Sequence, residues 1–213
     1  MLFELRGTED LTVEVGASLP LSSARELWPQ GLTFETRADR AVASLLVFHM
    51  RGLHGRGLPA PSFDYWEALW RLGVMWDGVP AWFGCACDID HPFVGWLGRR
   101  INRCPVRKAS FTHSEAEASC AVTATVEGYS LQLGATFGEE VAAVPPRQLI
   151  VRNQGSLYRI PWEEDPAPFR RFAEISILDA SLAQETLGRG VSFERVGVVH
   201  RGRVHHCGLA RRL

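Results

Sequence analysis

The chain has 213 residues, of which 46% are hydrophobic and 22% are charged, and its net charge is −1. These values are typical of a globular protein with one buried core, and they provide no global attraction to nucleic acid or to a membrane surface. We therefore expect one domain over residues 1–213, with neither a nucleic-acid partner nor a membrane partner.

The first half of the chain predicts strands around one short helix. Residues 2–5 and 11–15 are typical of two short strands, so residues 1–19 are expected to form an N-terminal hairpin extension. Ser23 and Glu26 have the spacing of a capping box and predict a helix that ends at Pro29. The apolar run 42–50 predicts a strand buried on both faces, and the Gly- and Pro-rich residues 51–61 predict a loop.

The remainder of the chain predicts more strands and a second helix. Five tryptophans surround the strand candidates 68–76 and 81–87, and we interpret them as core filling rather than as the wall of a pocket: Trp66, Trp70, Trp76, Trp82 and Trp96. Further strands are expected at 106–112, 120–126, 129–137, 149–152, 156–160, 191–200 and 203–209. A surface loop is expected around Pro161, Pro166 and Pro168. A second helix is expected from the Asp179 cap to Gly188.

This order of elements indicates the fold class. Strands dominate, the predicted helices are far apart, and no βαβ alternation is present. The sequence therefore predicts an α+β fold built on a mostly antiparallel sheet or barrel.

Cysteines and C-terminal arginines carry little functional signal. Five cysteines without an even framework predict reduced thiols, and the lack of a leader pattern or a long apolar stretch predicts a cytoplasmic protein. A metal site would need residues with poor spacing, so we expect no metal and no cofactor: Cys85, Cys87, His91, His205, His206 and Cys207. The arginines at 201, 203, 211 and 212 are typical of a solvated strand edge.

Lys108 is the single lysine of a chain that contains 22 arginines. An amine can lose its proton when it is desolvated and then attack a carbonyl group, whereas a guanidinium stays charged. The sequence leaves two interpretations open: a surface lysine without a role, or a nucleophile.

Several motifs resemble those of the acetoacetate-decarboxylase-like superfamily. Residues 22–32 are similar to the short helix ending in Pro-x-Gly that opens these proteins. Tyr65-Trp66-Glu67 resembles their Tyr-x-Glu motif. Residues 98–107 resemble their Gly-Arg-Glu segment, which leads to Pro-Lys-Lys. Val47-Phe48, Gly57-Leu58-Pro59 and Trp82-Phe83 resemble the YqjF-like bacterial branch. The resemblance implies a cone-shaped β-barrel with a few peripheral helices and an interior pocket.

The chain departs from the superfamily at the reactive position. The resemblance implies that the first lysine after the proline forms a Schiff base and the second lowers its pKa, a case known for acetoacetate decarboxylase. Here these positions hold Val106 and Arg107. On a continuous strand Val106 and Lys108 would share the interior face, because side chains alternate between faces. Lys108 would then be a displaced nucleophile.

Two functions follow, each with an organic acid or carbonyl compound as its small-molecule partner. In the first, a Schiff-base lyase, Lys108 forms the imine, Arg107 helps keep the amine neutral, and Glu67 moves protons or orients the ligand. Ligand contacts are expected from the residues around them: Tyr65, Arg99, Arg103 and Val106. In the second, a non-catalytic binding or sensing module, Lys108 and the arginines only anchor an anion. The sequence leaves open whether the protein is an enzyme and whether it forms a homo-oligomer.

Overall fold

The computed structural model describes residues 4–27, 31–56, 61–142, 146–165 and 167–213. Strand β1 (Glu4–Pro20) lies in the middle of its sheet, antiparallel to β4 (Arg40–Gly55) on one edge. On the other edge β1 pairs first with β16 (Arg203–Gly208) and then with β15 (Ser192–Arg201). The predicted N-terminal hairpin is therefore wrong for the described residues, because they form one continuous strand.

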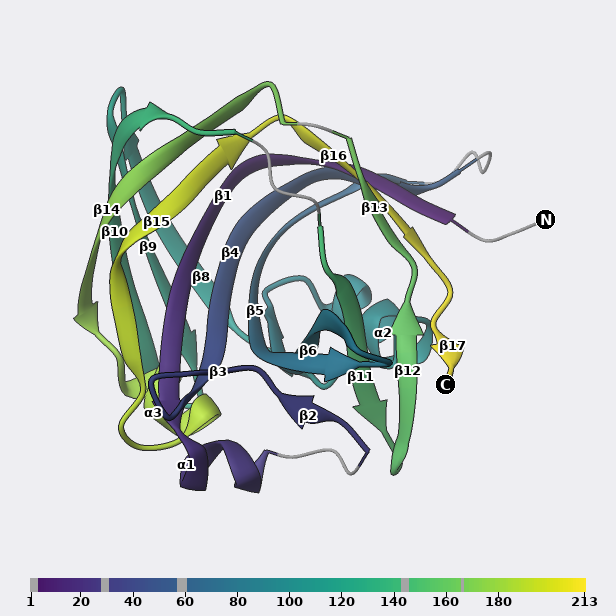
Figure 1. The fold of residues 1–213 in the computed structure, drawn as a ribbon. Coiled ribbons are helices and arrows are strands. Elements are labelled where there is room, and N and C mark those ends of the chain that lie inside the picture. The colour runs from purple at the N-terminus through teal and green to yellow at the C-terminus, as the bar shows by residue number, and fades with distance from the viewer. Residues whose placement is uncertain (1–3, 28–30, 57–60, 143–145, 166) are drawn as a thin grey trace.

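The sheet extends from both sides of β1 and curls into a barrel (Figure 1). Beyond β4 it continues through β5 (Phe63–Trp76) and β6 (Val79–Ile89), which is parallel to β7 (Val106–Lys108) and β11 (Gln148–Asn153). Beyond β15 it continues through four antiparallel strands: β14 (Phe169–Asp179), β10 (Tyr129–Glu140), β9 (Ser119–Val126) and β8 (Ser110–Ala116).

Five short strands complete the sheet: β2 (Thr33–Phe34), β3 (Thr36–Arg37), β12 (Ser156–Ile160), β13 (Trp162–Glu164) and β17 (Arg211–Arg212). The loop predicted at 51–61 is partly wrong, since β4 reaches Gly55, and residues 57–60 lie outside the described residues. The loop predicted around three prolines is also partly wrong, because β13 and the start of β14 fall within it.

Three short helices accompany the barrel. Helix α1 (Leu21–Glu26) and α3 (Ser181–Leu187) lie side by side at one end, where the Ser23 hydroxyl donates to the Arg189 carbonyl at 3.0 Å. Ser23 therefore does not cap α1, so the predicted capping box is wrong; the predicted end at Pro29 lies outside the described residues. The second predicted helix is confirmed as α3, which begins at Ser181, two residues after Asp179.

The third helix, α2 (Pro92–Arg100), was not predicted. It begins with proline in its first turn, and the His91 ring accepts a hydrogen bond from the Val94 amide at 3.3 Å. None of the helices among the described residues has the length and apolar character needed to cross a membrane.

Both faces of β4 are buried over residues 42–50, as the apolar run predicted, and both faces of β5 are buried as well. Leu45, Val47 and Trp70 belong to a large hydrophobic cluster that extends to β9, β10 and α3. Leu46 and Phe48 face the opposite side and belong to a smaller cluster with residues of β11 and α2. This smaller cluster lies on the side of the sheet that holds the cavities described below.

The strand predicted at 106–112 is interrupted at Ala109. Its first part, β7, is parallel to β6, whereas its second part, β8, is antiparallel to β9. The amide of Ala109 donates to the carbonyl of Ile89 at 3.0 Å, so the chain changes partner at this residue. Alternation along one continuous strand therefore does not describe this segment.

Candidate functional site

The barrel interior contains two adjoining cavities. The outer cavity has a volume of about 1090 Å³ and a lining rich in arginine and acidic side chains. The inner cavity has a volume of about 60 Å³ and a mostly apolar lining. Leu69, Leu149 and Trp162 line both cavities and form the wall between them.

Alternate residues of β5 supply one side of both cavities. Tyr65, Glu67 and Leu69 line the inner cavity, and Leu69 and Arg71 line the outer one. This follows from the two-residue period of a strand, which places all four side chains on the same face. Tyr65 and Glu67, expected from the sequence to contact the ligand and to act in catalysis, thus line the same cavity, and their roles stay predictions.

Glu67 is the most unusual group of the inner cavity. Only 8% of the residue is exposed, and the Cys87 thiol donates to its Oε1 at 3.1 Å. Burial raises the pKa of Glu67 to about 7, and the negative charges of Glu9 and Asp88 act in the same direction. A carboxyl group with such a pKa exchanges its proton near neutral pH.

Other polar atoms in the inner cavity lack hydrogen-bond partners among the described residues. They are Oδ1 of Asn102 and Nε2 of His205, a residue that is 3% exposed and whose Nε2 lies 3.5 Å from Oε1 of Glu164. Buried polar atoms are normally paired, so their convergence on a cavity indicates a place for a water or a ligand group. The thiols of Cys87, Cys104 and Cys207 also line this cavity, and burial raises the pKa of each.

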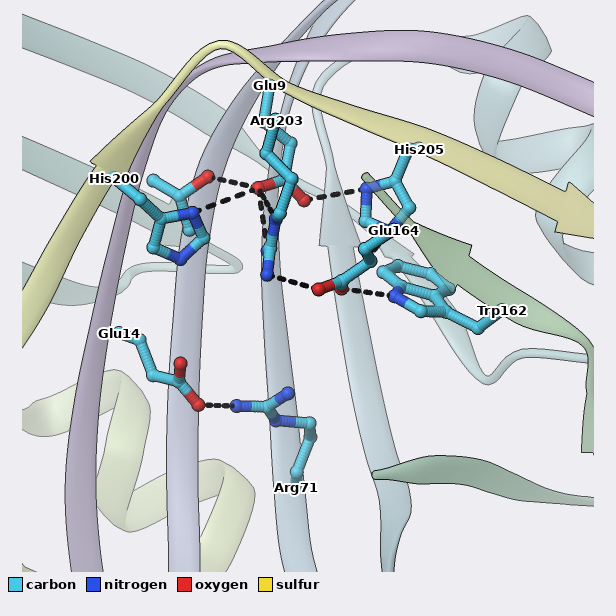
Figure 2. Close-up of polar contacts among 9 residues, drawn as sticks. Glu9, Glu14, Arg71, Trp162, Glu164, His200, Arg203 and His205 are labelled. Atoms are coloured by element: carbon cyan, nitrogen blue, oxygen red, sulfur yellow. Dashed lines mark hydrogen bonds and ion pairs between the residues drawn. The ribbon is translucent and has the colours of Figure 1, made fainter. Parts of the chain in front are cut away.

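A buried charged network occupies the junction of the two cavities (Figure 2). Its centre is Glu9, which is fully buried and accepts hydrogen bonds from Thr12 at 2.6 Å and from the Arg203 guanidinium at 2.7 and 2.9 Å. Nδ1 of His205 lies 2.7 Å from Oε1 of Glu9, and Arg203 also binds Glu164. The network thus joins β1, β13 and β16.

The pKa values of Glu9 and His200 are both lower than usual, for different reasons. Burial alone would raise the pKa of Glu9, but the contacts with His205 and Arg203 outweigh it and hold that pKa well below its ordinary value. Burial, reinforced by the positive charge of Arg203, lowers the pKa of His200 to about 4. Glu9 is therefore ionised and His200 is neutral at pH 7.

The side chains of the three consecutive residues expected at the reactive position point in different directions. Val106 packs beneath α2, where its methyl groups face Gly95 and Gly98, and it joins the smaller hydrophobic cluster. Arg107 points to the other face, towards Asp88 and Thr186. Lys108 is exposed and lines neither cavity, so the expectation of a dry interior amine is wrong.

The two arginines expected to bind ligand do not line either cavity. Arg99 is exposed and donates to the Val106 carbonyl at 3.3 Å. Arg103 lies over the ring of Tyr158, with 5.9 Å between the guanidinium carbon and the ring centroid. Nor do the described residues include a group of three or more His, Cys, Asp or Glu side chains arranged to hold a metal ion.

Sequence reasoning missed the Glu9 network. The C-terminal arginines were interpreted as a solvated edge, which is wrong for Arg203, whose side chain is 13% exposed. Glu9 and Arg203 are nearly two hundred residues apart in the chain, so no local pattern links them. The one available signal was the absence of acids from the C-terminal tail, which leaves its basic residues to pair with distant carboxylates.

Comparison with known proteins agrees with this architecture. No family model and no curated protein matches the sequence. Among solved structures, acetoacetate decarboxylase from Legionella pneumophila has a TM-score of 0.75 at 12% identity, covering 98% of this chain and 86% of that chain. An acetoacetate-decarboxylase-like enzyme from Sphingomonas wittichii RW1 has a TM-score of 0.72 at 14% identity, covering 100% and 92%.

The enduracididine biosynthesis enzyme MppR has a TM-score of 0.74 at 14% identity, covering 100% of this chain and 88% of that chain. The predicted fold class is confirmed: the protein has an acetoacetate-decarboxylase-like fold, mostly antiparallel and with few helices. At these identities the similarity shows the fold alone. The resemblance to the YqjF-like branch stays a prediction.

Glu67 should make the native protein less stable at alkaline pH. Because its pKa is about 7 when folded and ordinarily 4.5, the folded state holds its proton more tightly. The stabilisation linked to that proton is complete below pH 4.5 and is lost as the pH rises through 7. We expect Glu67→Gln to gain about 3 kcal/mol over native protein at pH 8 and little at pH 4, measured by urea unfolding. An equal difference at both pH values would contradict the assignment.

Proposed function

We propose that the protein binds a small organic acid or carbonyl compound without forming a covalent bond, with the oxygen of the ligand in the inner cavity. The observation that carries this proposal is that Glu67, His205 and Asn102 line one buried space, where Nε2 of His205 and Oδ1 of Asn102 lack hydrogen-bond partners among the described residues. Unpaired buried polar atoms are costly. The protonated carboxyl group of Glu67 can donate to a ligand oxygen, and a hydroxyl group or a water that enters with the ligand can donate to Oδ1 of Asn102.

The size of the inner cavity limits what enters it. About 60 Å³ corresponds to roughly two water molecules at about 30 Å³ each, or to a carboxyl or carbonyl group. A larger ligand would reach this space past Leu69, Leu149 and Trp162. The similar enzyme MppR supports this ligand class, since one of its structures, with a TM-score of 0.68 at 14% identity, is a complex with pyruvate.

Ligand binding should depend on the hydrogen-bonding capacity of residue 67. The probes are pyruvate, acetone and methyl pyruvate, measured by thermal stabilisation, and we expect at least one to bind native protein. Glu67→Leu should weaken this binding about tenfold, because leucine offers neither a donor nor an acceptor. Glu67→Gln retains both and should bind within about threefold of native protein, since the variant still offers the ligand a neutral hydrogen bond.

These two variants form a matched pair. Neither introduces a buried charge, and removal of a buried carboxylate is often neutral or stabilising, so both are expected to fold. Equal binding by native protein and Glu67→Leu would place the ligand elsewhere. A lack of binding by all three compounds would reject this ligand class and the proposal with it.

Lys108 takes no part in this function. Its side chain is exposed, and the chain contains no second lysine that could replace it. We expect pyruvate and borohydride to leave no adduct that distinguishes native protein from Lys108→Arg, read by intact mass. Both proteins keep the same α-amine, so a reaction there affects them equally. An adduct on native protein that is missing from Lys108→Arg would restore the Schiff-base lyase and overturn the non-covalent proposal.

A further inference from the structure

A cross-strand pair of basic side chains lies in the outer cavity, away from the inner one. Arg170 of β14 is directly opposite His200 of β15 in the antiparallel register, and both residues line the outer cavity. Side chains of directly opposed residues lie on the same face, with their Cβ atoms about 5 Å apart. Arg170 and His200 therefore project from neighbouring positions on one face of the sheet into the outer cavity.

Arg170 has no carboxylate partner in the part of the chain that the structure describes. The acids that line the outer cavity all have other basic partners: Glu14 contacts Arg71, Glu164 contacts Arg203, Asp165 contacts His206 and Glu194 contacts Arg37. Within the described ranges, no carboxylate contacts the Arg170 guanidinium, and its Nε is buried without a hydrogen-bond partner. Nε of Arg171 is also buried without a partner, but only Arg170 lines the cavity, so only its guanidinium can reach an anion held there.

His200 supplies a second, independent indication. The residue is 2% exposed, and its Nδ1 has no hydrogen-bond partner among the residues described, although it lies 3.6 Å from Oε2 of Glu9. Figure 2 shows the opposite edge of the ring, which carries Nε2, turned away from Glu9 and towards the Glu14–Arg71 pair. The proximity of Glu9 favours the tautomer with the proton on Nδ1, so Nε2 is an acceptor when the ring is neutral.

We infer that Arg170 and His200 form an oxyanion-binding site in the outer cavity, which takes up a carboxylate or a phosphate-type group together with one proton. The proton comes from solvent and is added to Nε2 of His200, which turns this atom from an acceptor into a charged donor facing the anion. The guanidinium of Arg170 supplies the other charge-assisted hydrogen bonds. No bond is broken in the protein or in the ligand.

The charges around His200 explain why the proton and the anion should bind together. Glu9 and Glu14 on β1 favour the charged ring, whereas Arg170 on β14 and Arg203 on β16 oppose it. His205 contacts Glu9 from β16, and Arg71 on β5 is held by Glu14. Burial and the two arginines keep the ring neutral in the empty site. An anion between Arg170 and His200 reverses this balance, so its binding should raise the pKa of His200.

The test uses small probes of defined charge: formate for a carboxylate, sulfate for a phosphate-type group, and formamide as a neutral control. Formate and sulfate stay fully ionised between pH 5.5 and 7.5, so any pH dependence belongs to the protein. Thermal stabilisation is measured at constant ionic strength in native protein, Arg170→Gln and Arg171→Gln. Arg171 is the matched control, because the adjacent side chain on β14 lies over Phe169 and does not line the cavity.

We expect formate, sulfate or both to bind native protein and Arg171→Gln, and to bind Arg170→Gln at least tenfold more weakly. Which of the two anions binds better distinguishes a carboxylate ligand from a phosphate-type one. Sulfate stabilises folded proteins in general, so only the difference between the two variants counts. Equal binding by both variants, or binding of formamide as strong as that of formate, would overturn the anion site.

Proton uptake is measured on native protein, so it does not depend on the folding of a histidine variant. Calorimetric titration in two buffers with different protonation heats should show a net uptake between zero and one proton at pH 6. The affinity should fall by up to about tenfold for each unit of rising pH. Anion binding without proton uptake would overturn the role of His200. The neutral carbonyl probes of the inner cavity are unaffected by this result, so the two proposals fail separately.

Discussion

Glu9→Gln is expected to lower the free energy of unfolding by about 3 to 5 kcal/mol at pH 7. Glu9 is fully buried, and its carboxylate is the anion shared by Arg203 and His205. Glutamine has the same shape but no charge, so the variant leaves the Arg203 guanidinium with Glu164 as its remaining carboxylate partner. The measurement is urea unfolding followed by circular dichroism.

The control for this variant is Glu194→Gln. Glu194 pairs with Arg37 at 3.7 Å, and the two side chains are 57% and 83% exposed, so its loss should change stability by less than about 1 kcal/mol. The effect of Glu9→Gln should also shrink in acid. Since the folded-state pKa of Glu9 is lowered, the ionised carboxylate stabilises the folded protein fully above pH 4.5, and this stabilisation is lost as the pH falls further. Similar losses in both variants would refute a special role for the buried charge.

Arg107→Met is expected to destabilise the protein by about 3 to 5 kcal/mol. The Arg107 guanidinium donates from Nε and Nη2 to the two carboxylate oxygens of Asp88, at 2.6 and 2.9 Å. Asp88 is fully buried and also accepts a hydrogen bond from Trp70. Methionine retains much of the volume of the side chain but leaves the Asp88 charge without its cation.

Two further variants separate this mechanism from a general effect of losing an arginine. Arg100→Met removes an exposed arginine at the end of α2 and should leave stability within about 0.5 kcal/mol of native protein. Asp88→Asn combined with Arg107→Met should recover part of the loss, because no buried charge remains. A double variant as unstable as Arg107→Met alone would show that packing, not charge, dominates at this position.

The sequence was informative where the alternation of a strand is regular. The apolar run 42–50 correctly predicted a strand buried on both faces, and Tyr65 and Glu67 lie two residues apart and share one cavity. The strands predicted at 120–126 and 129–137 also form, joined by a two-residue turn in which Glu127 and Gly128 both have positive φ, the conformation that such a hairpin turn requires.

Regular alternation failed where a strand is irregular. Bulges between Arg6 and Thr8 and between Glu9 and Leu11 shift the register of β1, which made one long strand look like two short ones. The change of partner at Ala109 similarly defeated the prediction for Lys108, because the argument assumed one continuous strand from Val106 onwards. Neither irregularity has a local signature that a single sequence reveals.

The charged interior was beyond prediction for a different reason. Glutamate and arginine are usually solvated, so the sequence alone favours a surface position for Glu9, Arg170 and Arg203. Glu9 and Arg203 are removed from solvent because β1 pairs with β16 from the other end of the chain, whereas Arg170 is half-buried on β14, beside β15. Only the three-dimensional fold shows which carboxylate neutralises which cation, and therefore that Arg170 lacks a partner among the described residues.

The central place of β1 in the sheet constrains how the protein is made. The strand is synthesised before β15 and β16, yet one of its two edges pairs with these strands, which span residues 192–208. During translation β1 therefore remains an open edge, with Glu9 unneutralised by Arg203, until those residues have left the ribosome. Such long-range closure is slow in folding and exposes the unfinished sheet to aggregation. A truncated chain that ends before residue 192 should consequently associate with chaperones, whereas the chain of residues 1–213 released from the ribosome should not.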